Sequence, residues 1–212
     1  MSKELDELIK AVKDLSNHLD KKAKTILFLD TETTGLPINW KAPYDQWPRM
    51  VSLAYSLEGV PFPEEGEFII KPEGYEIPLE ASNIHGITNE EAHAKGQDLH
   101  LVLIKLEVML QLADLVVFHN SSFDTGIISG EQIRAGWKPE ELICKSNKLF
   151  CTKEQSTNIC KIPNVGRGGY KWPSLAELCA FCGVENQTAH NALSDVIATK
   201  ECYFYLLEKG YF

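Results

Sequence analysis

Two carboxylates lie at positions whose spacing is suited to binding a metal ion. Asp30-Thr-Glu32 directly follows the apolar run ILFL. Side chains alternate along a strand, so both carboxylates project to one face and repel each other unless a cation lies between them. A divalent metal ion would remove that conflict. The alternative is a strand that runs into a polar turn, with Asp30 and Glu32 solvated.

Two further segments combine a carboxylate with a histidine. HNSSFD ends at Asp124, which we place in the first turn of a helix after the apolar run LVVF. HNALSD runs from His190, just before the last helix, to Asp195 inside it. Histidine titrates near neutral pH and can take a proton from water. Each segment also has a plainer interpretation: Asn120 and Asp124 suit a helix N-terminus, and His190 suits a polar surface.

The hydrophobic pattern predicts the elements that must position these residues. Short apolar runs predict strands at 25–30, 50–57, 67–71, 115–120 and 149–152. Helical spacing and capping residues predict helices at 88–92, 98–112, 121–136, 174–183 and 192–208. Strands that precede and then alternate with helices indicate an α/β fold, a mixed sheet with helices on its faces. Functional groups gather at strand ends in such sheets.

Three segments lie outside this pattern. An apolar stripe over 2–21 predicts an opening helix, and we divide the chain into an N-terminal helical extension, 1–22, and one domain, 23–212. The segment 37–48 is a proline-broken loop with aromatic anchors. The glycine-containing segment 153–173 is expected to be an irregular, flexible loop.

Composition is that of an ordinary globular chain, with 44% hydrophobic and 24% charged residues among 212. No apolar run reaches the length of a membrane span, and the N-terminus offers no signal-peptide core, so we expect a cytoplasmic protein without a membrane partner. The six cysteines are expected to be reduced thiols. Cys179 and Cys182 form a CxxC, but no second pair accompanies it to complete a zinc site. The net charge of −9 argues against long-range attraction to a polyanion.

The Asp-x-Glu, HNxxFD and HxxxxD segments, in this order, resemble the three motifs of the DEDDh group. These are the DnaQ-like 3′→5′ exonucleases, which include polymerase III epsilon-type proofreading subunits and TREX-type enzymes. The segment 85–88 also resembles the HGIT segment that these proteins carry between the first two motifs. The resemblance covers roughly 25–208. It implies a ribonuclease H-like fold, a mixed five-stranded sheet flanked by helices, and an exonuclease domain over 23–212.

The resemblance also implies a metal centre. Its ligands would be Asp30, Glu32, Asp124 and Asp195, holding two Mg²⁺ ions or Mn²⁺ in their place. Two such ions activate a water and stabilise the leaving 3′ oxygen, and His190 would be the general base. Two Mg²⁺ add four positive charges, so the net charge of −9 becomes −5. The chain stays acidic, which favours binding through a few contacts at a 3′ end over binding along the length of a duplex.

Substrate contacts are implied by the same resemblance. Thr33, Leu36 and His85 would lie beside the terminal nucleotide, with Leu36 as a wedge against the last base. Asn120 and Phe123 complete the expected substrate site, although Phe123 suits the core equally well. Three residues of the glycine-containing loop are candidates for contacts with the phosphate and base of the substrate: Arg167, Lys171 and Trp172. The alternative is that these loop side chains are solvated.

The expected function is therefore 3′→5′ exonuclease activity on DNA, with single-stranded or frayed ends favoured and nucleoside 5′-monophosphates released. One alternative is an exoribonuclease of the same family, since no feature of the sequence reads the 2′-hydroxyl. Another is a nucleic-acid-binding subunit associated with a DNA polymerase. A phosphatase or a two-carboxylate glycosidase does not account for HNxxFD and HxxxxD. The opening helix is expected to pack on its own domain, on a polymerase or on a second copy of the chain.

Overall fold

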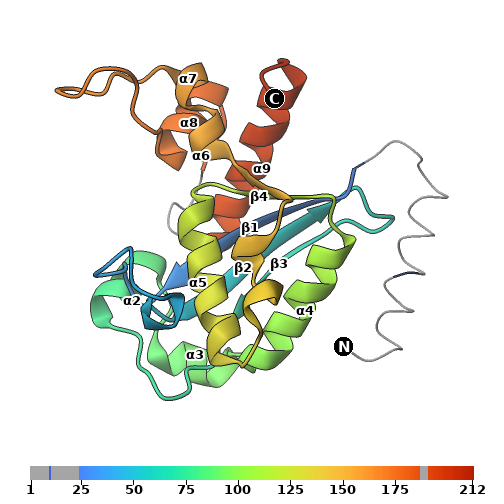
Figure 1. Cartoon of the computed structure of the whole chain (residues 1–212), viewed down its shortest axis with the longest axis vertical. Helices are drawn as coiled ribbons and strands as arrows, with labels where there is room; N and C mark the ends of the chain where they lie inside the picture. Colours follow the sequence, from blue (N-terminus) through green and yellow to red (C-terminus); the bar gives the residue numbers. More distant parts are fainter. Residues whose placement is uncertain (1–9, 11–23, 187–190) are drawn as a thin grey trace.

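The chain is built around a five-stranded sheet with strand order β3-β2-β1-β4-β5 (Figure 1). This computed structural model describes residues 10, 24–186 and 191–212. The central strand β1 pairs antiparallel with β2 and parallel with β4, so the sheet is mixed, and the predicted α/β architecture is confirmed. The strands are β1 (Ile26–Thr33), β2 (Met50–Glu58), β3 (Glu64–Ile69), β4 (Leu115–Phe118) and β5 (Leu149–Cys151).

Helices cover both faces of the sheet, with α4 and α5 on one side and α9 on the other (Figure 1). The helices are α2 (Leu79–His85), α3 (Asn89–Lys95), α4 (Leu99–Leu112), α5 (Ser121–Arg134), α6 (Thr152–Gln155), α7 (Thr157–Cys160), α8 (Leu175–Cys182) and α9 (Ala192–Glu208). Short 3-10 turns lie at Tyr44–Gln46, Pro139–Glu141 and Ile143–Lys145. Within the described residues, no helix is both long enough and apolar enough to cross a bilayer.

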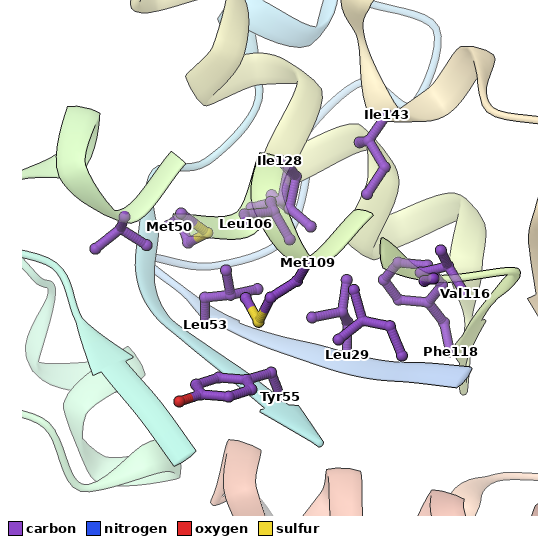
Figure 2. Close-up of a cluster of buried hydrophobic side chains, with 14 of the residues drawn as sticks. Leu29, Met50, Leu53, Tyr55, Leu106, Met109, Val116, Phe118, Ile128 and Ile143 are labelled. Atoms are coloured by element: carbon purple, nitrogen blue, oxygen red, sulfur yellow. The ribbon is translucent and has the colours of Figure 1, made fainter. Parts of the chain in front are cut away.

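Alternation along β1 places its apolar side chains in two core clusters, one on each face of the sheet. Leu29 of β1 and Leu53 of β2 pack with residues of α4 and α5, as Figure 2 shows. Phe28 faces the other way and packs with Val196 and Tyr203 of α9. Because side chains alternate, Asp30 and Glu32 continue the row of Phe28 and project toward α9.

Most of the predicted elements are present, with four corrections. β1 runs on to Thr33, beyond the end predicted at residue 30, so Glu32 lies inside the strand together with Asp30. β3 begins at Glu64, earlier than predicted, because pairing with β2 extends through polar residues. α2 was not predicted, and α6 and α7 occupy part of the segment predicted to be irregular; all three are too short to show helical periodicity.

The capping residues that predicted the helix at 174–183 are confirmed. At the start of α8, the Ser174 hydroxyl accepts from the backbone N–H of Glu177, whose side chain accepts from the backbone of Ser174. Gly183 ends that helix with a φ of 72°. The predicted opening helix and the 1–22 extension, apart from Lys10, lie outside the described residues.

Candidate active site

Three carboxylates from two elements meet at one point of the sheet. Asp30 and Glu32 come from β1 and Asp195 from the first turn of α9, and their oxygens lie within 4.8 Å of one another. Asn191 fixes the start of α9, because its side chain accepts from the backbone N–H of Ser194. Asn186 donates to Oδ1 of Asp195 over 2.6 Å and so orients that carboxylate. The structure thus brings these three sequence-predicted residues together.

The three carboxylates repel one another in a partly dehydrated site. Burial, with the charges of Asp124, Asp195 and Glu32, holds the pKa of Asp30 well above its usual range. Burial and the charge of Asp195 raise the pKa of Glu32 to about 8. An all-oxygen set of this kind fits a hard divalent cation, which would relieve the repulsion.

Glu67 is a further carboxylate beside this group, and it was missed in the sequence. It lies on β3 opposite Ala54, which in turn pairs with Asp30, so the three form a row across the sheet. Its charge contributes to the raised pKa of both Asp30 and Glu32. Within the described residues, its buried Oε1 has no hydrogen-bond partner. Only the strand register brings Glu67 to the site, and the sequence gives no local signal of that register.

Asp124 lies near these carboxylates but outside the 4.8 Å group. It is in the first turn of α5, as predicted, and is 2% exposed. Its Oδ1 accepts two hydrogen bonds from Thr31, the residue between Asp30 and Glu32. Burial raises the pKa of Asp124 to about 7, although the bonds from Thr31 oppose that shift.

His190, the expected base, lies outside the described residues. It directly precedes Asn191, the N-cap of the helix that carries Asp195.

A first cavity, of about 540 Å³, opens beside Glu32 and is called here the Glu32 cavity. Leu36 and His85 line it, and Leu36 is 72% exposed. Thr33 also lines it, but its hydroxyl donates to the carbonyl of Gly35 and shapes the turn that presents Leu36. His85 is buried, and its Nδ1 accepts from the backbone of Ile87. Burial lowers the pKa of His85, which keeps the ring neutral near pH 7.

A second cavity, of about 370 Å³, contains Asp30 and Asp195 and is called here the Asp30 cavity. Trp40 and Lys153 lie on its walls. Its other wall residues include two predicted substrate residues, Asn120 and Phe123, together with His119 and Leu36.

Asn120 and Phe123 each combine a structural position with a place in the Asp30 cavity. Asn120 is the N-cap of α5 in a left-handed conformation, φ 107°, and its Oδ1 accepts from Lys153 Nζ over 3.0 Å instead of capping the helix. Phe123 packs against the core cluster and also lines both cavities, so its position is compatible with either of the two expected roles. Trp40 and Lys153 were not chosen from the sequence, where a loop tryptophan and a lone lysine are unremarkable.

The three residues proposed from the glycine-containing loop differ in their contacts. Lys171 forms an ion pair of 2.6 Å with Glu177. Trp172 is 61% exposed, and Lys153 Nζ lies 5.2 Å from the centre of its ring. Arg167 is exposed at the tip of the loop.

The cysteines predicted to be reduced are all free thiols. Cys179 and Cys182 of the CxxC are buried with Cys202 in an apolar cluster between α8 and α9. Cys179 Sγ lies 3.7 Å from Cys202 Sγ.

Comparison with known proteins agrees with this geometry. The model of the RNase T exonuclease family matches residues 27–203. A structure of E. coli exonuclease I in complex with a dT13 oligonucleotide is 23% identical, with a TM-score of 0.67, over 87% of this chain and 41% of that one. A zinc-bound E. coli exonuclease I complex with single-stranded DNA is 22% identical, with a TM-score of 0.68, over 88% of this chain and 41% of that one.

The chain therefore spans less than half the length of these exonuclease I chains. No curated protein sequence gave a match. The structural likeness confirms the ribonuclease H-like fold of the exonucleases. Because the family model covers most of the chain, including Asp30, Glu32, Asp124 and Asp195, this chain belongs to the RNase T exonuclease family, within the DEDDh group of DnaQ-like 3′→5′ exonucleases.

Proposed function

We propose that this chain is a metal-dependent 3′→5′ exonuclease that removes nucleotides one at a time from DNA, with single-stranded or frayed ends favoured. The observation that carries the proposal is the group of Asp30, Glu32 and Asp195, whose oxygens lie within 4.8 Å of one another between two cavities. Released products would be nucleoside 5′-monophosphates.

Asp30, Glu32, Asp124 and Asp195 would hold two Mg²⁺ ions, or Mn²⁺ in their place. Bound there, the ions would supply activation of the attacking water and relief of charge on the leaving 3′ oxygen. Asn186 and Thr31 would act by orienting the carboxylates of Asp195 and Asp124. His190 would accept the proton of the water as general base.

The Glu32 cavity would hold the terminal nucleoside, with Leu36, His85 and Phe123 around it. A phosphodiester joins two nucleosides, so a bond cleaved at the carboxylates has one nucleoside on each side. Leu36 and Phe123 line both cavities and would keep these two nucleosides apart. Such separation is easier for an unpaired end than for a stacked duplex, which supports single-stranded or frayed substrates.

Substrate identity is supported by two further observations. E. coli exonuclease I, which has the same fold, has been solved in complex with dT13 and dA16 oligonucleotides and with single-stranded DNA. The net charge of −9 disfavours long-range attraction to a polyanion and so favours recognition at the end itself.

The test is hydrolysis of single-stranded DNA, duplex DNA and RNA, each labelled at either end, with Mg²⁺, Mn²⁺ or chelator. We expect stepwise shortening from the 3′ end, fastest on single-stranded DNA, and no activity in chelator. Asp195→Asn should lower turnover about a thousandfold or more, whereas Asp45→Asn, at an exposed carboxylate of the 37–48 loop, should match the unaltered chain. Activity in chelator, or an active Asp195→Asn chain, would refute the metal mechanism, and faster cleavage of RNA would reassign the substrate.

The role of His190 as general base is tested separately. His190→Ala should lower turnover strongly while the thermal shift produced by Mg²⁺ stays as in the unaltered chain. An unchanged rate would remove His190 as the base.

A further inference from the structure

The Asp30 cavity is bounded on one side by a tryptophan that the catalytic carboxylates do not need. Trp40 comes from the 37–48 loop and is 52% exposed. Its ring meets Trp47 at 5.4 Å with an interplanar angle of 77°, and Phe123 at 6.0 Å with an angle of 49°. Trp47 is itself buried, and its indole N–H donates to the carbonyl of Ala42. The indole of Trp40 is therefore fixed by two aromatic neighbours while half of its surface stays open.

The position of this indole relative to the carboxylates limits what can cover it. Trp40 lines the same cavity as Asp30 and Asp195, whereas it does not line the Glu32 cavity. If the terminal nucleoside occupies the Glu32 cavity, the nucleoside on the other side of the scissile phosphate must enter the Asp30 cavity. The base of that nucleoside then lies beside an exposed indole, the side chain on which bases stack in single-strand-binding proteins.

We propose that Trp40 is a stacking platform for the second nucleobase from the 3′ end, and that this contact helps to position the strand for cleavage. The proposal rests on the proposed exonuclease function and adds a binding residue to its site. Stacking on Trp40 compensates the second base for the stacking it loses when Leu36 and Phe123 separate it from the terminal base.

Charge in the same cavity supports a nucleotide as the occupant. Lys153 of α6 lines the cavity, with its Nζ held 3.0 Å from Asn120 Oδ1 and 5.2 Å from the ring centre of Trp172. Its ammonium is placed to meet a phosphate of the strand, in a chain whose net charge is −9. An apolar ligand would offer no anionic group to the ammonium of Lys153.

The competing explanation is that Trp40 only holds the 37–48 loop together through Trp47. The two explanations differ in whether the effect of removing the indole depends on a base in the substrate. An oligothymidylate with an abasic site at the second position from the 3′ end lacks the stacking partner and keeps the phosphates. The same abasic site at the fourth position serves as the matched control substrate.

The experiment measures KM and kcat for Trp40→Ala, Trp40→Phe and a control, Phe62→Ala, on these two substrates and on the intact oligothymidylate. Phe62 is an exposed aromatic residue between β2 and β3 that lines neither cavity. Trp40→Ala should raise KM about tenfold on the intact and fourth-position substrates, and Trp40→Phe should restore most of the loss. On the second-position abasic substrate, the unaltered chain should already show the raised KM, and Trp40→Ala should add nothing. Phe62→Ala should show no dependence on the second base. An equal effect of Trp40→Ala on all substrates, or none on any, overturns the proposal.

A binding measurement separates this proposal from the exonuclease function itself. With Ca²⁺ in place of Mg²⁺, 2-aminopurine at the second position should lose fluorescence on binding, and Trp40→Ala should abolish that quenching. 2-Aminopurine at the fourth position should respond equally in both chains. If the unaltered chain shortens no 3′ end, the proposed function fails while this measurement still decides stacking. If it shortens 3′ ends without position-specific quenching, only the stacking proposal fails.

Discussion

Thr31 donates two hydrogen bonds to Oδ1 of Asp124, one from its backbone N–H over 3.1 Å and one from its hydroxyl over 2.8 Å. Thr31 lies between Asp30 and Glu32 on β1, and Asp124 belongs to α5. These bonds therefore tie α5 to the strand at the point where the carboxylates gather. They also stabilise the charged form of a carboxylate that burial would otherwise keep protonated.

Thr31→Val should weaken both the fold and the activity. It removes the hydroxyl donor at constant shape and leaves a buried acceptor with one bond fewer, which should cost about 1–2 kcal/mol of unfolding free energy. Because the hydroxyl bond from Thr31 lowers the pKa of Asp124, its loss should raise that pKa further above about 7. Activity should fall about tenfold at pH 7 and recover partly at higher pH. A rate-against-pH profile and urea unfolding would measure both effects.

Thr31→Ser is the matched control, because it keeps the hydroxyl. It should retain the pH profile of the unaltered chain. If Thr31→Val does not shift the acidic limb of the rate-against-pH profile, the hydroxyl of Thr31 does not lower the pKa of Asp124.

Stability of the metal-free protein should fall as pH rises. Asp30, Glu32 and Asp124 have folded-state pKa values above their ordinary ones, about 8 for Glu32 and about 7 for Asp124. A group of this kind contributes stability that is fully present below its ordinary pKa and is lost as pH rises through the folded pKa. In chelator, the melting temperature should therefore drop between about pH 5 and pH 8, on the order of 5 °C or more.

Mg²⁺ should reverse that loss, and more strongly at pH 8 than at pH 5, since protons compete with the metal for the carboxylates. Thermal unfolding at several pH values, with and without Mg²⁺, measures how the melting temperature in chelator and the shift produced by Mg²⁺ each change with pH. A melting temperature that rises with pH in chelator would show that the carboxylates are not mutually repelling.

Glu32→Gln should stabilise the metal-free protein while inactivating it. The substitution removes one of the charges that raise the pKa of Asp30 and keeps the side-chain shape. In chelator at pH 8, its melting temperature should exceed that of the unaltered chain, and the shift produced by Mg²⁺ should shrink or vanish. Glu140→Gln, at an exposed carboxylate, should change neither quantity. A lower melting temperature for Glu32→Gln in chelator would contradict the repulsion argument.

The sequence predicts the parts of this site that depend on local order. Alternation alone places Asp30 and Glu32 on one face, and the helix after LVVF places Asp124 in a first turn, as found. Approach of Asp195 to Asp30 depends on how α9 packs on the sheet, which periodicity does not encode. Glu67 reaches the site through strand register and Trp40 through loop packing on Trp47, so neither was identified beforehand.

Gly126→Ala should disturb the 37–48 loop from inside α5. Alanine normally favours a helix interior over glycine by about 1 kcal/mol. Here a Cβ would overlap the indole of Trp47, which is 5% exposed and bonded to Ala42. The rigid ring must move, so we expect a net loss of about 1–3 kcal/mol and a changed tryptophan emission spectrum.

Ser122→Ala, at an exposed position of the same helix, is the control and should leave both quantities close to those of the unaltered chain. If Gly126→Ala stabilises the chain, Trp47 can move to admit the added Cβ without a loss of unfolding free energy.

Leu36→Ala should weaken substrate binding without weakening the fold. Leu36 is 72% exposed and lines both cavities, so its truncation removes little buried surface but opens the partition between them. Ile38, two residues further along the chain, is even more exposed, at 105%, and lines neither cavity, which makes Ile38→Ala the matched control. Both variants should unfold at the melting temperature of the unaltered chain. Leu36→Ala alone should raise KM for single-stranded 3′ ends, by about five- to tenfold. If the two variants have equal KM values, the position of Leu36 between the cavities makes no contribution to substrate binding.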